Sequence, residues 1–402
     1  MNTPPTIGTH DAVIVGAGLS GLSLAWELKR KGIRAVILEK ETEIAAPWQR
    51  RHPQLRLNTH RRLSSLPGYA LPRHGPAFPS RDEIIAYLER YAAQTDADIR
   101  FGTAVKRLDR CGDDWELTTD AGPVRARNVI FATGKENTPR IPDWPGRARW
   151  RGELIHSAAL GDVSRYAGLD VLVVGAGNSG SDVLNHLAGV DTRSLSVAVR
   201  QGSVVVPSRL LGFPMQLAAP IMDALPNWLV DRLLFDTERL AFGRLERFGF
   251  PVRKGGASRL LAEGVSPAID NGFIASLKAG KASIVPAIDR FEEDAVILSD
   301  GRRLKPDILI AATGYRTGLH GLLDHLGVLS DHGYPQAGTD GAAIGQPGLW
   351  FAGMAPRMSG YFRAASKNSP VMAEAISQCL AASPRHELLN LRGPAPVLNP
   401  AE

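Results

Sequence analysis

The sequence predicts an α/β protein built from two nested domains, with one inserted into the other. Three observations lead to this prediction. A glycine-rich turn at residues 16–21 (GAGLSG) stands between a strand-like and a helix-like run, and residues 175–180 (GAGNSG) repeat the arrangement. In each half a later apolar run ends in Ala-Thr-Gly, at residues 132–134 and 312–314. A strand, a GxGxxG turn, a helix and a further strand are typical of Rossmann-like dinucleotide-binding domains.

The first half supplies these elements in order. Asp11 opens a run of apolar residues that predicts a buried strand, and the residues after the glycine turn show the apolar spacing of a helix. Residues 47–80 are rich in Arg, Pro and His and predict an irregular loop. We expect strands at 11–15, 33–38, 115–119, 124–126 and 129–132, and helices at 19–31 and 82–93.

The second half restarts the same pattern. Its segment from Leu210 to Val230 is apolar but is broken by three prolines, which predicts buried core or the wall of a substrate pocket rather than a membrane span. We expect strands at 171–174, 195–199, 295–298 and 307–311, and helices from the second glycine turn to residue 187 and at 369–380.

The first glycine turn has the residues that a dinucleotide requires. Gly16 makes the tight turn, Gly18 lets a pyrophosphate approach the backbone, and Gly21 lets helix and strand pack closely. The start of the helix offers free N–H groups to that anion. Glu39 closes the next strand, where a carboxylate can bind a ribose diol but repels a 2′-phosphate. This half therefore suits the adenosine part of FAD or NAD.

The second glycine turn has the opposite charge preference. Gly175, Gly177 and Gly180 repeat the spacing, with Asn178 and Ser179 between the last two. Arg200 occupies the strand end that Glu39 occupies in the first half. A guanidinium binds phosphate oxygens in a planar, bidentate way, so this site favours the 2′-phosphate of NADPH over NADH.

Two nucleotide sites of opposite charge preference imply a bound flavin and a nicotinamide donor, FAD in the first domain and NADPH in the second. We expect the FAD-binding domain to use residues 11–165 and 290–385, and the NADPH-binding domain to use 168–288. Residues 386–402 predict a flexible C-terminal tail. Because no CxxC pair exists, electrons from the flavin are expected to pass to oxygen or an external acceptor rather than to an internal disulfide.

Composition narrows the function classes. The net charge of +6 comes without a long basic run, which argues against nucleic-acid binding. The sequence has no HExxH or CxxC, so no metal site is expected. Two separated cysteines, and no apolar leader at the N-terminus, favour a cytoplasmic protein. A homodimer is a further expectation.

Several segments resemble the class B flavin-containing monooxygenases, especially their compact bacterial and YUCCA-like members. The second glycine turn resembles the family's second nucleotide loop, and residues 150–160 (WRGELIHSAAL) resemble the fingerprint FxGxxxHxxx(Y/F). Trp150 and Leu160 depart from that fingerprint, and Leu160 also differs from the Trp of the related Baeyer–Villiger enzymes. The likeness extends from residue 11 to about 380.

The resemblance implies a single-component monooxygenase. NADPH would reduce FAD, oxygen would add to give a C4a-(hydro)peroxyflavin, and a small organic substrate would receive one oxygen atom. N- or S-oxygenation and YUCCA-like oxidative decarboxylation of a 2-oxo acid are the leading reactions. A Baeyer–Villiger monooxygenase, and an NADPH-dependent reductase or oxidase that passes electrons to a partner or to oxygen, stay open as alternatives.

The resemblance also implies roles for single residues. Asn58 matches an asparagine placed near flavin and nicotinamide, and is our candidate for the catalytic residue. His156 is expected to be structural rather than an acid–base group. The further cofactor contacts implied in this way are Trp48, Val105, Thr133, Gly134, Thr313, Gly314, Tyr315 and Gly353.

Overall fold

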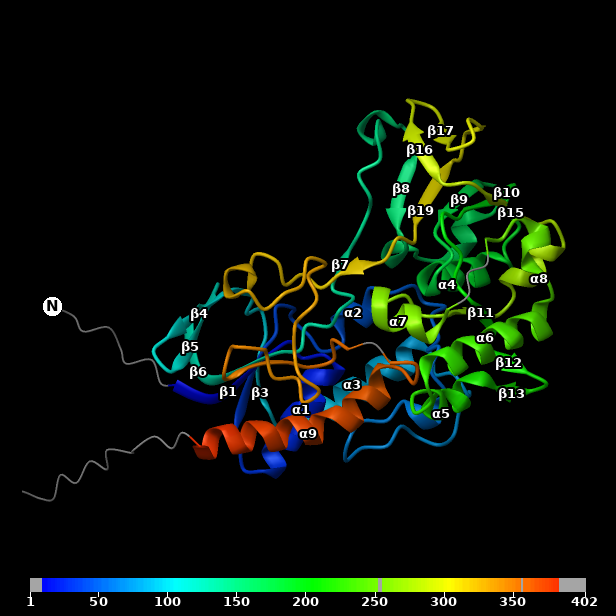
Figure 1. The fold of residues 1–402 in the computed structure, drawn as a ribbon. Helices are drawn as coiled ribbons and strands as arrows, with labels where there is room; N and C mark the ends of the chain where they lie inside the picture. The colour runs from blue at the N-terminus through cyan, green and yellow to red at the C-terminus, as the bar shows by residue number, and fades with distance from the viewer. Residues whose placement is uncertain (1–8, 252–254, 356, 383–402) are drawn as a thin grey trace, which may run out of the picture.

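The structure, a computed structural model, describes residues 9–251, 255–355 and 357–382. Figure 1 shows two lobes that lie side by side. The first lobe is built on a seven-stranded sheet of order β3-β2-β1-β6-β5-β4, with β21 also paired to β6. The strands are β1 (Thr9–Val15), β2 (Ala35–Leu38), β3 (Asp98–Arg100), β4 (Val105–Cys111), β5 (Asp114–Thr119), β6 (Gly122–Phe131) and β21 (Leu349–Phe351).

Both faces of the first sheet are buried, which explains why its central strands are continuous apolar runs. Along β1, Ala12 and Ile14 join one hydrophobic core, whereas Val13 and Val15 join another on the opposite face. Three helices supply residues to the Ala12 side, and β4, β5 and the loops around residues 319–328 cover the other. These helices are α1 (Leu19–Arg30), α3 (Arg81–Thr95) and α9 (Tyr361–Ala382).

Strand β6 corrects the sequence-based division into strands at 124–126 and 129–132. It is continuous because the polar Asn128 that interrupts the apolar run is buried with its hydrogen bonds satisfied. The Asn128 amide donates to the Asp11 carbonyl at 3.2 Å and accepts from the Trp350 indole N–H at 2.9 Å.

The second lobe is built on a parallel five-stranded sheet of order β15-β10-β9-β19-β8. Helices α4 and α8 pack on one face, and the small sheet β16-β17-β18 with the loops before β8 covers the other. The elements are β8 (Glu153–His156), β9 (Asp170–Val174), α4 (Asn178–Leu187), β10 (Ser194–Ala198), α8 (Phe273–Lys278), β15 (Ala282–Val285), β16 (Ile288–Phe291), β17 (Val296–Leu298), β18 (Arg303–Leu304) and β19 (Ile308–Ala311).

The second sheet extends beyond the range 168–288 that the sequence assigned to the inserted domain. β8 and β19 precede and follow that range, yet they pair with each other and β19 pairs with β9. The chain crosses between the lobes at β7 (Thr138–Pro139) and β20 (Tyr315–Arg316), which pair antiparallel. The structural boundaries of the insertion therefore lie at these two paired segments.

Residues 203–270 add a cover to the second lobe, and here sequence analysis placed no helix. The longest element is α6, which starts after Pro226 and buries Val230, Leu234 and Glu238. The elements are β11 (Val205–Pro207), β12 (Arg209–Leu210), β13 (Phe213–Pro214), α5 (Ala219–Met222), α6 (Asn227–Phe242), α7 (Ala257–Glu263) and β14 (Ala268–Asp270).

Three further expectations concern the last helix, the segment 47–80 and the C-terminal tail. Helix α9 begins at Tyr361 rather than residue 369 and continues through Pro370. The segment 47–80 is irregular apart from α2 (Ala46–Gln49) and short helical turns, as predicted. The predicted tail, 386–402, lies outside the described residues.

Candidate functional site

The first glycine turn combines two crowded positions with one open position. A Cβ at Gly16, where φ is +107°, would lie 3.0 Å from the Ala132 carbonyl oxygen. A Cβ at Gly21 would lie 2.1 Å from the carbonyl oxygen of Gly16. Helix α1 can therefore lie this close to the strand only because residue 21 is glycine. A Cβ at Gly18 would meet no atom within 4 Å. The open position faces the space that a bound pyrophosphate needs.

The second glycine turn repeats this geometry. A Cβ at Gly175 would lie 2.7 Å from the Ala312 carbonyl oxygen, and one at Gly180 would lie 2.0 Å from the carbonyl oxygen of Gly175. A Cβ at Gly177 would again meet nothing within 4 Å. The two Ala-Thr-Gly strand ends therefore support the two turns in the same way.

Both helices that follow the turns present bare N-termini. Helix α1 begins after Gly18 and α4 begins after Gly177, and neither has a side-chain cap or an acidic residue in its first turn. Unpaired N–H groups and the helix dipole favour an anion at such a position. The observed geometry fits a dinucleotide pyrophosphate at each turn.

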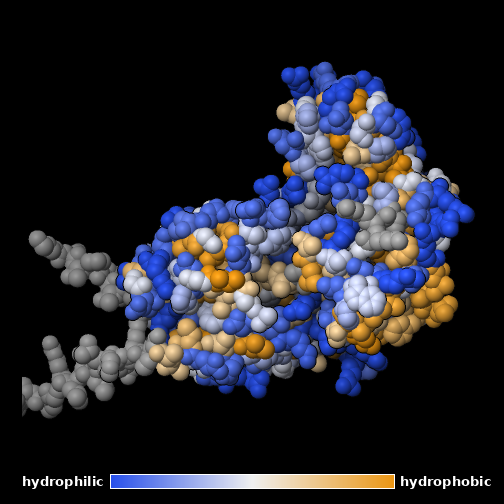
Figure 2. Space-filling view, in the orientation of Figure 1, coloured by the Kyte–Doolittle hydropathy of each residue, from blue (hydrophilic) through white to orange (hydrophobic). Residues whose placement is uncertain are grey.

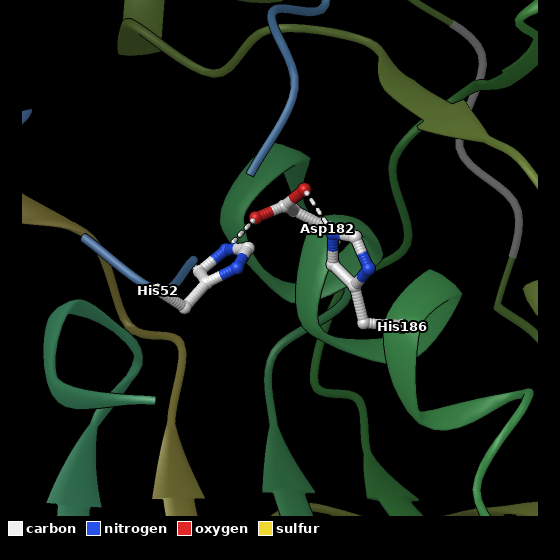
Figure 3. Close-up of side chains that lie close together, drawn as sticks. All are labelled: His52, Asp182 and His186. Atoms are coloured by element: carbon white, nitrogen blue, oxygen red, sulfur yellow. Dashed lines mark hydrogen bonds and ion pairs between the residues drawn. The ribbon is translucent and has the colours of Figure 1, made fainter. Parts of the chain in front are cut away.

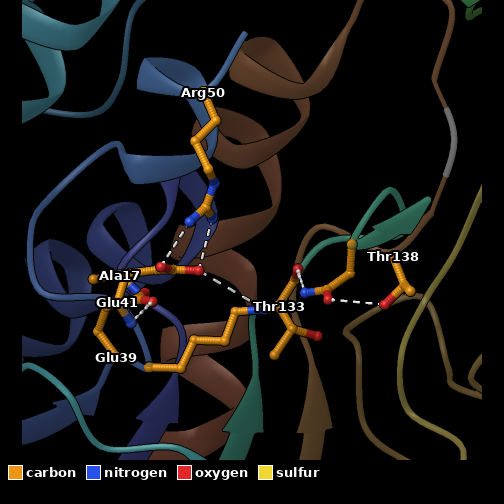
Figure 4. A network of polar contacts seen from close by, with 8 residues as sticks. Ala17, Glu39, Glu41, Arg50, Thr133 and Thr138 are labelled. Atoms are coloured by element: carbon orange, nitrogen blue, oxygen red, sulfur yellow. Dashed lines mark hydrogen bonds and ion pairs between the residues drawn. The ribbon is translucent and has the colours of Figure 1, made fainter. Parts of the chain in front are cut away.

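Glu39 lies against the first turn, as expected for a ribose ligand. Its carboxylate accepts hydrogen bonds from the backbone N–H groups of Ala17 at 2.6 Å and Glu41 at 3.0 Å (Figure 4). Arg50 forms a bidentate pair with the Glu41 carboxylate at 2.7 and 2.8 Å, which lowers the pKa of Glu41. These contacts hold the end of β2 beside the turn.

Other predicted contacts of the first cofactor surround the same turn. A Cβ at Gly353 would lie 2.1 Å from the Ser20 hydroxyl oxygen in the first turn of α1. Thr133 and Gly134 follow β6, and the buried hydroxyl of Thr133 has no hydrogen-bond partner among the described residues. Trp48 lies half-buried on α2. Val105 begins β4, two residues after Thr103, whose N–H donates to the Glu39 carbonyl at 2.8 Å.

An exposed arginine side chain, that of Arg200, accompanies the second turn. Arg200 follows β10 and is exposed, and it forms no hydrogen bond or ion pair with any residue that the structure describes. Asn178 and Ser179 form the first turn of α4. Thr313 follows β19, and its hydroxyl donates to the Arg140 carbonyl. An unpaired guanidinium beside the turn fits the 2′-phosphate that the sequence predicts.

His156 and Tyr315 pack together where the chain crosses between the lobes. The two rings meet edge to face at 4.9 Å, and the Arg51 guanidinium lies over the Tyr315 ring at 5.0 Å. His156 Nδ1 accepts from the Ala158 N–H at 3.1 Å, so Nε2 donates to the Gly314 carbonyl at 3.0 Å. Burial lowers the pKa of His156. Both ring nitrogens of His156 are therefore bonded to the backbone.

Asn58 connects the two lobes. Its side-chain amide donates to Asn178 Oδ1 at 3.0 Å, which joins the irregular segment of the first lobe to the first turn of α4. The sequence separated these residues by 120 positions, and the fold places the candidate catalytic residue directly beside the second glycine turn.

A small apolar pocket lies beside Asn58. Its wall comes mainly from the segment 206–234, which includes the segment 210–230 that the sequence predicted as core or pocket wall, together with side chains from distant parts of the chain. The lining residues are Asn58, Phe78, Val206, Pro207, Ser208, Met215, Gln216, Ala219, Met222, Leu234, Ile269 and Met358. Phe78 and Met358 were not predicted, because nothing in their local sequence indicates that they reach this segment.

The surface is hollowed where the two lobes meet, and apolar side chains gather on the second lobe (Figure 2). Exposed large apolar residues in its cover include Leu211, Ile221, Trp228 and Leu240. In the described ranges, no helix has the length and apolarity needed to cross a membrane.

Comparisons with known proteins give one consistent result. Residues 13–204 match the family model described as pyridine nucleotide-disulphide oxidoreductase. The chain is 33% identical over 365 residues to the probable indole-3-pyruvate monooxygenase YUCCA3 of Arabidopsis thaliana, covering 86% of this chain and 82% of that protein. It is 34% identical to the indole-3-pyruvate monooxygenase YUCCA1 of Oryza sativa subsp. japonica, covering 86% and 87%.

Solved structures agree on the fold. A flavin-containing monooxygenase from Stenotrophomonas maltophilia matches with a TM-score of 0.68 at 23% identity, covering 94% of this chain and 99% of that chain. OTEMO, in a complex with FAD and NADP, matches with a TM-score of 0.72 at 19% identity, covering 93% and 85%. The chain therefore belongs to the class B flavin-containing monooxygenase family, and it is a single-component oxidoreductase that uses FAD and NADPH.

Proposed function

We propose that the first lobe holds FAD and the second holds NADPH. Gly16, Gly18, Gly21, Glu39 and Gly353 would form the FAD site, supported by the open position at Gly18 and the unpartnered Thr133 hydroxyl. The turn at residues 175–180 and Arg200 would hold NADPH. When bound, the two cofactors supply the hydride and the electrons that activate oxygen.

We propose an aromatic 2-oxo acid as the substrate and oxidative decarboxylation as the reaction. The relatives named above are indole-3-pyruvate monooxygenases, and the pocket beside Asn58 is walled by Phe78, Val206, Met215 and Ile269. The 2-oxo acid, O₂, NADPH and a proton would give a carboxylic acid one carbon shorter, CO₂, NADP⁺ and water. The observation that carries the assignment is an apolar pocket lined by Asn58, whose side chain bonds to Asn178 at the second turn.

The chain's own residues would bind and orient the substrate. The Asn58 amide would hold an oxygen of the substrate by a hydrogen bond, with its position fixed by Asn178. The apolar wall would exclude water, which protects reactive species from hydrolysis. Arg209 is exposed and follows the lining residue Ser208, and its guanidinium lies 5.8 Å from the ring centroid of Phe78, which also lines the pocket. From there it would pair with the substrate carboxylate.

The experiment that tests this proposal combines the FAD-loaded protein, NADPH and indole-3-pyruvate under ¹⁸O₂. We expect indole-3-acetate carrying one labelled oxygen, with CO₂ released in equal amount. Hydrogen peroxide without labelled product would favour the reductase or oxidase alternative. Labelled products only from amines, sulfides or simple ketones would favour N- or S-oxygenation or a Baeyer–Villiger reaction. The homodimer and the cytoplasmic location stay predictions.

A further inference from the structure

Three metal-ligating side chains meet at the junction of the lobes, outside the cofactor turns and the apolar pocket. His52 comes from the irregular segment of the first lobe, and Asp182 and His186 lie one turn apart on α4 (Figure 3). His52 Nε2 lies 3.0 Å from Asp182 Oδ2, and His186 Nε2 lies 3.6 Å from Asp182 Oδ1. One ligand atom from each residue lies within 4.8 Å of the others.

The ligand atoms lie close enough together for one cation to contact all three side chains. Zinc binds imidazole nitrogen and carboxylate oxygen at about 2.0–2.2 Å, so neighbouring ligand atoms in a tetrahedron are about 3.4 Å apart. The 3.0 Å separation ends on Asp182 Oδ2 and the 3.6 Å separation ends on Asp182 Oδ1, so each imidazole lies within about one such edge of the carboxylate that both face. Three protein ligands leave the fourth position for water, as in many protein zinc sites.

Burial and charge also prepare the cluster for a cation. His52 is only 3% exposed, and its Nδ1 has no hydrogen-bond partner among the described residues. The Asp182 carboxylate lies between the two imidazoles, with one oxygen facing each ring. Two imidazoles and one carboxylate suit a transition cation such as Zn²⁺ better than Mg²⁺ or Ca²⁺, which prefer oxygen ligands.

We propose that His52, Asp182 and His186 form a binding site for one divalent transition cation, Zn²⁺ or a cation of similar chemistry, which clamps the two lobes together. The sequence predicted no metal site because it contains no local metal motif, and His52 and Asp182 are 130 positions apart. The same segments also carry the Asn58–Asn178 bond. A bound cation would fix the position of Asn58 against the second glycine turn.

Direct binding to the full-length, FAD-loaded protein tests the site. After chelator treatment, Zn²⁺ is added in a calorimeter to the wild type, Asp182→Asn and His186→Ala. His320→Ala serves as the matched control, because His320 pairs with Asp324 at 2.8 Å at the same i, i+4 sequence spacing but on the exposed surface. His52 is left unchanged because its burial makes its replacement disruptive to folding.

We expect one Zn²⁺ per wild-type chain, at least a tenfold loss of affinity in Asp182→Asn and His186→Ala, and no change in His320→Ala. Melting temperature gives a second measurement, since a cation that binds only the folded state raises it, and the rise grows with the logarithm of the ratio of free cation to Kd. That rise should disappear in the two cluster variants. No saturable binding to the wild type, or equal binding by wild type and both cluster variants, would overturn the proposal.

Discussion

The Asn58 side chain donates a hydrogen bond to Asn178 Oδ1 at 3.0 Å, so a residue of the first lobe is held by the helix that starts at the second glycine turn. Because Asn58 also lines the apolar pocket, this bond joins the pocket wall to the second turn. It also explains how a residue in an irregular segment can keep a defined position, because the helix provides a rigid partner.

The bond leads to a double-mutant prediction. Asn58→Ala and Asn178→Ala should each lower kcat/KM about tenfold, which corresponds to about 1.4 kcal/mol, and should increase hydrogen peroxide release. The double variant should lose less than the sum, because both changes remove the same bond. Steady-state kinetics of the four proteins measures this coupling. Fully additive effects would show that the two side chains act independently.

Arg200 should determine the choice between NADPH and NADH. Arg200→Glu should raise the KM for NADPH about 10–100-fold, because a charge-assisted bond is replaced by repulsion, and should leave the KM for NADH nearly unchanged. Arg193→Glu is a suitable control, since Arg193 pairs with Asp170 and Asp307 near the opposite strand end. An equal rise in KM for NADPH and NADH would show that Arg200 does not contact the 2′-phosphate.

The open and crowded glycines of the first turn should respond differently to the same substitution. Gly18→Ala should leave the melting temperature of the cofactor-free protein nearly unchanged but weaken FAD binding, because the new methyl enters open space that the pyrophosphate needs. Gly21→Ala should destabilise the fold itself, because its Cβ would lie 2.1 Å from a backbone oxygen. Thermal melting with and without FAD separates these effects. Equal destabilisation of both cofactor-free variants would contradict the assignment.

Glu238 should make stability depend on pH. Its carboxyl is 1% exposed, and burial raises its pKa from 4.5 to about 7. Because the folded-state pKa is the higher one, stability is lost as pH rises from 4.5 through about 7. The corresponding loss is about 3 kcal/mol. Glu238→Gln can still accept the bond that Val205 N–H donates at 2.7 Å.

Chemical denaturation at about pH 5 and about pH 8 measures this dependence. Glu238→Gln should have a higher free energy of unfolding than the wild type, and this difference should be larger at the higher pH. Asp236→Asn, which alters an exposed ion pair with Arg232 on the same helix, is the control and should show little change. An advantage that is the same at both pH values would contradict the raised pKa.

Arg209 should recognise the carboxylate of the proposed substrate. Arg209→Ala should raise the KM for indole-3-pyruvate about tenfold, the equivalent of one charge-assisted bond, with kcat changed less. Oxidation of a neutral sulfide, if the protein accepts one, should be unaffected. Arg232→Ala, which removes an exposed arginine paired with Asp236 on α6, controls for general surface effects. An unchanged KM would remove Arg209 from the substrate site.

Local sequence predicted the parts of the fold whose geometry is local. The two glycine turns follow from spacing alone, because crowding at Gly21 and Gly180 comes from the turn's own carbonyl oxygens. The sequence could not show where the second sheet begins and ends, because β8 and β19 are far apart in the chain and become neighbours only when the lobe folds. Helix α6 was missed because Trp228 and Leu240 face solvent and blur its amphipathic pattern.

The residues of the site also divide into those that the local sequence predicted and those that it did not. Glu39 and Arg200 occupy strand ends that the sequence identified, whereas Phe78 and Met358 reach the pocket through contacts between distant segments. His52 and His186 likewise belong to different lobes. Residues that meet only through tertiary structure carry no signal in one sequence.

The measurement that tests the central claim most directly is the fate of the electrons from NADPH. The FAD-loaded protein is supplied with NADPH, oxygen and indole-3-pyruvate, and NADPH oxidised, organic product and hydrogen peroxide are quantified together. The account predicts nearly one oxygenated product per NADPH and little peroxide. Conversion of nearly all NADPH equivalents to hydrogen peroxide, with no oxygenated product from this or any other substrate tested, would contradict it.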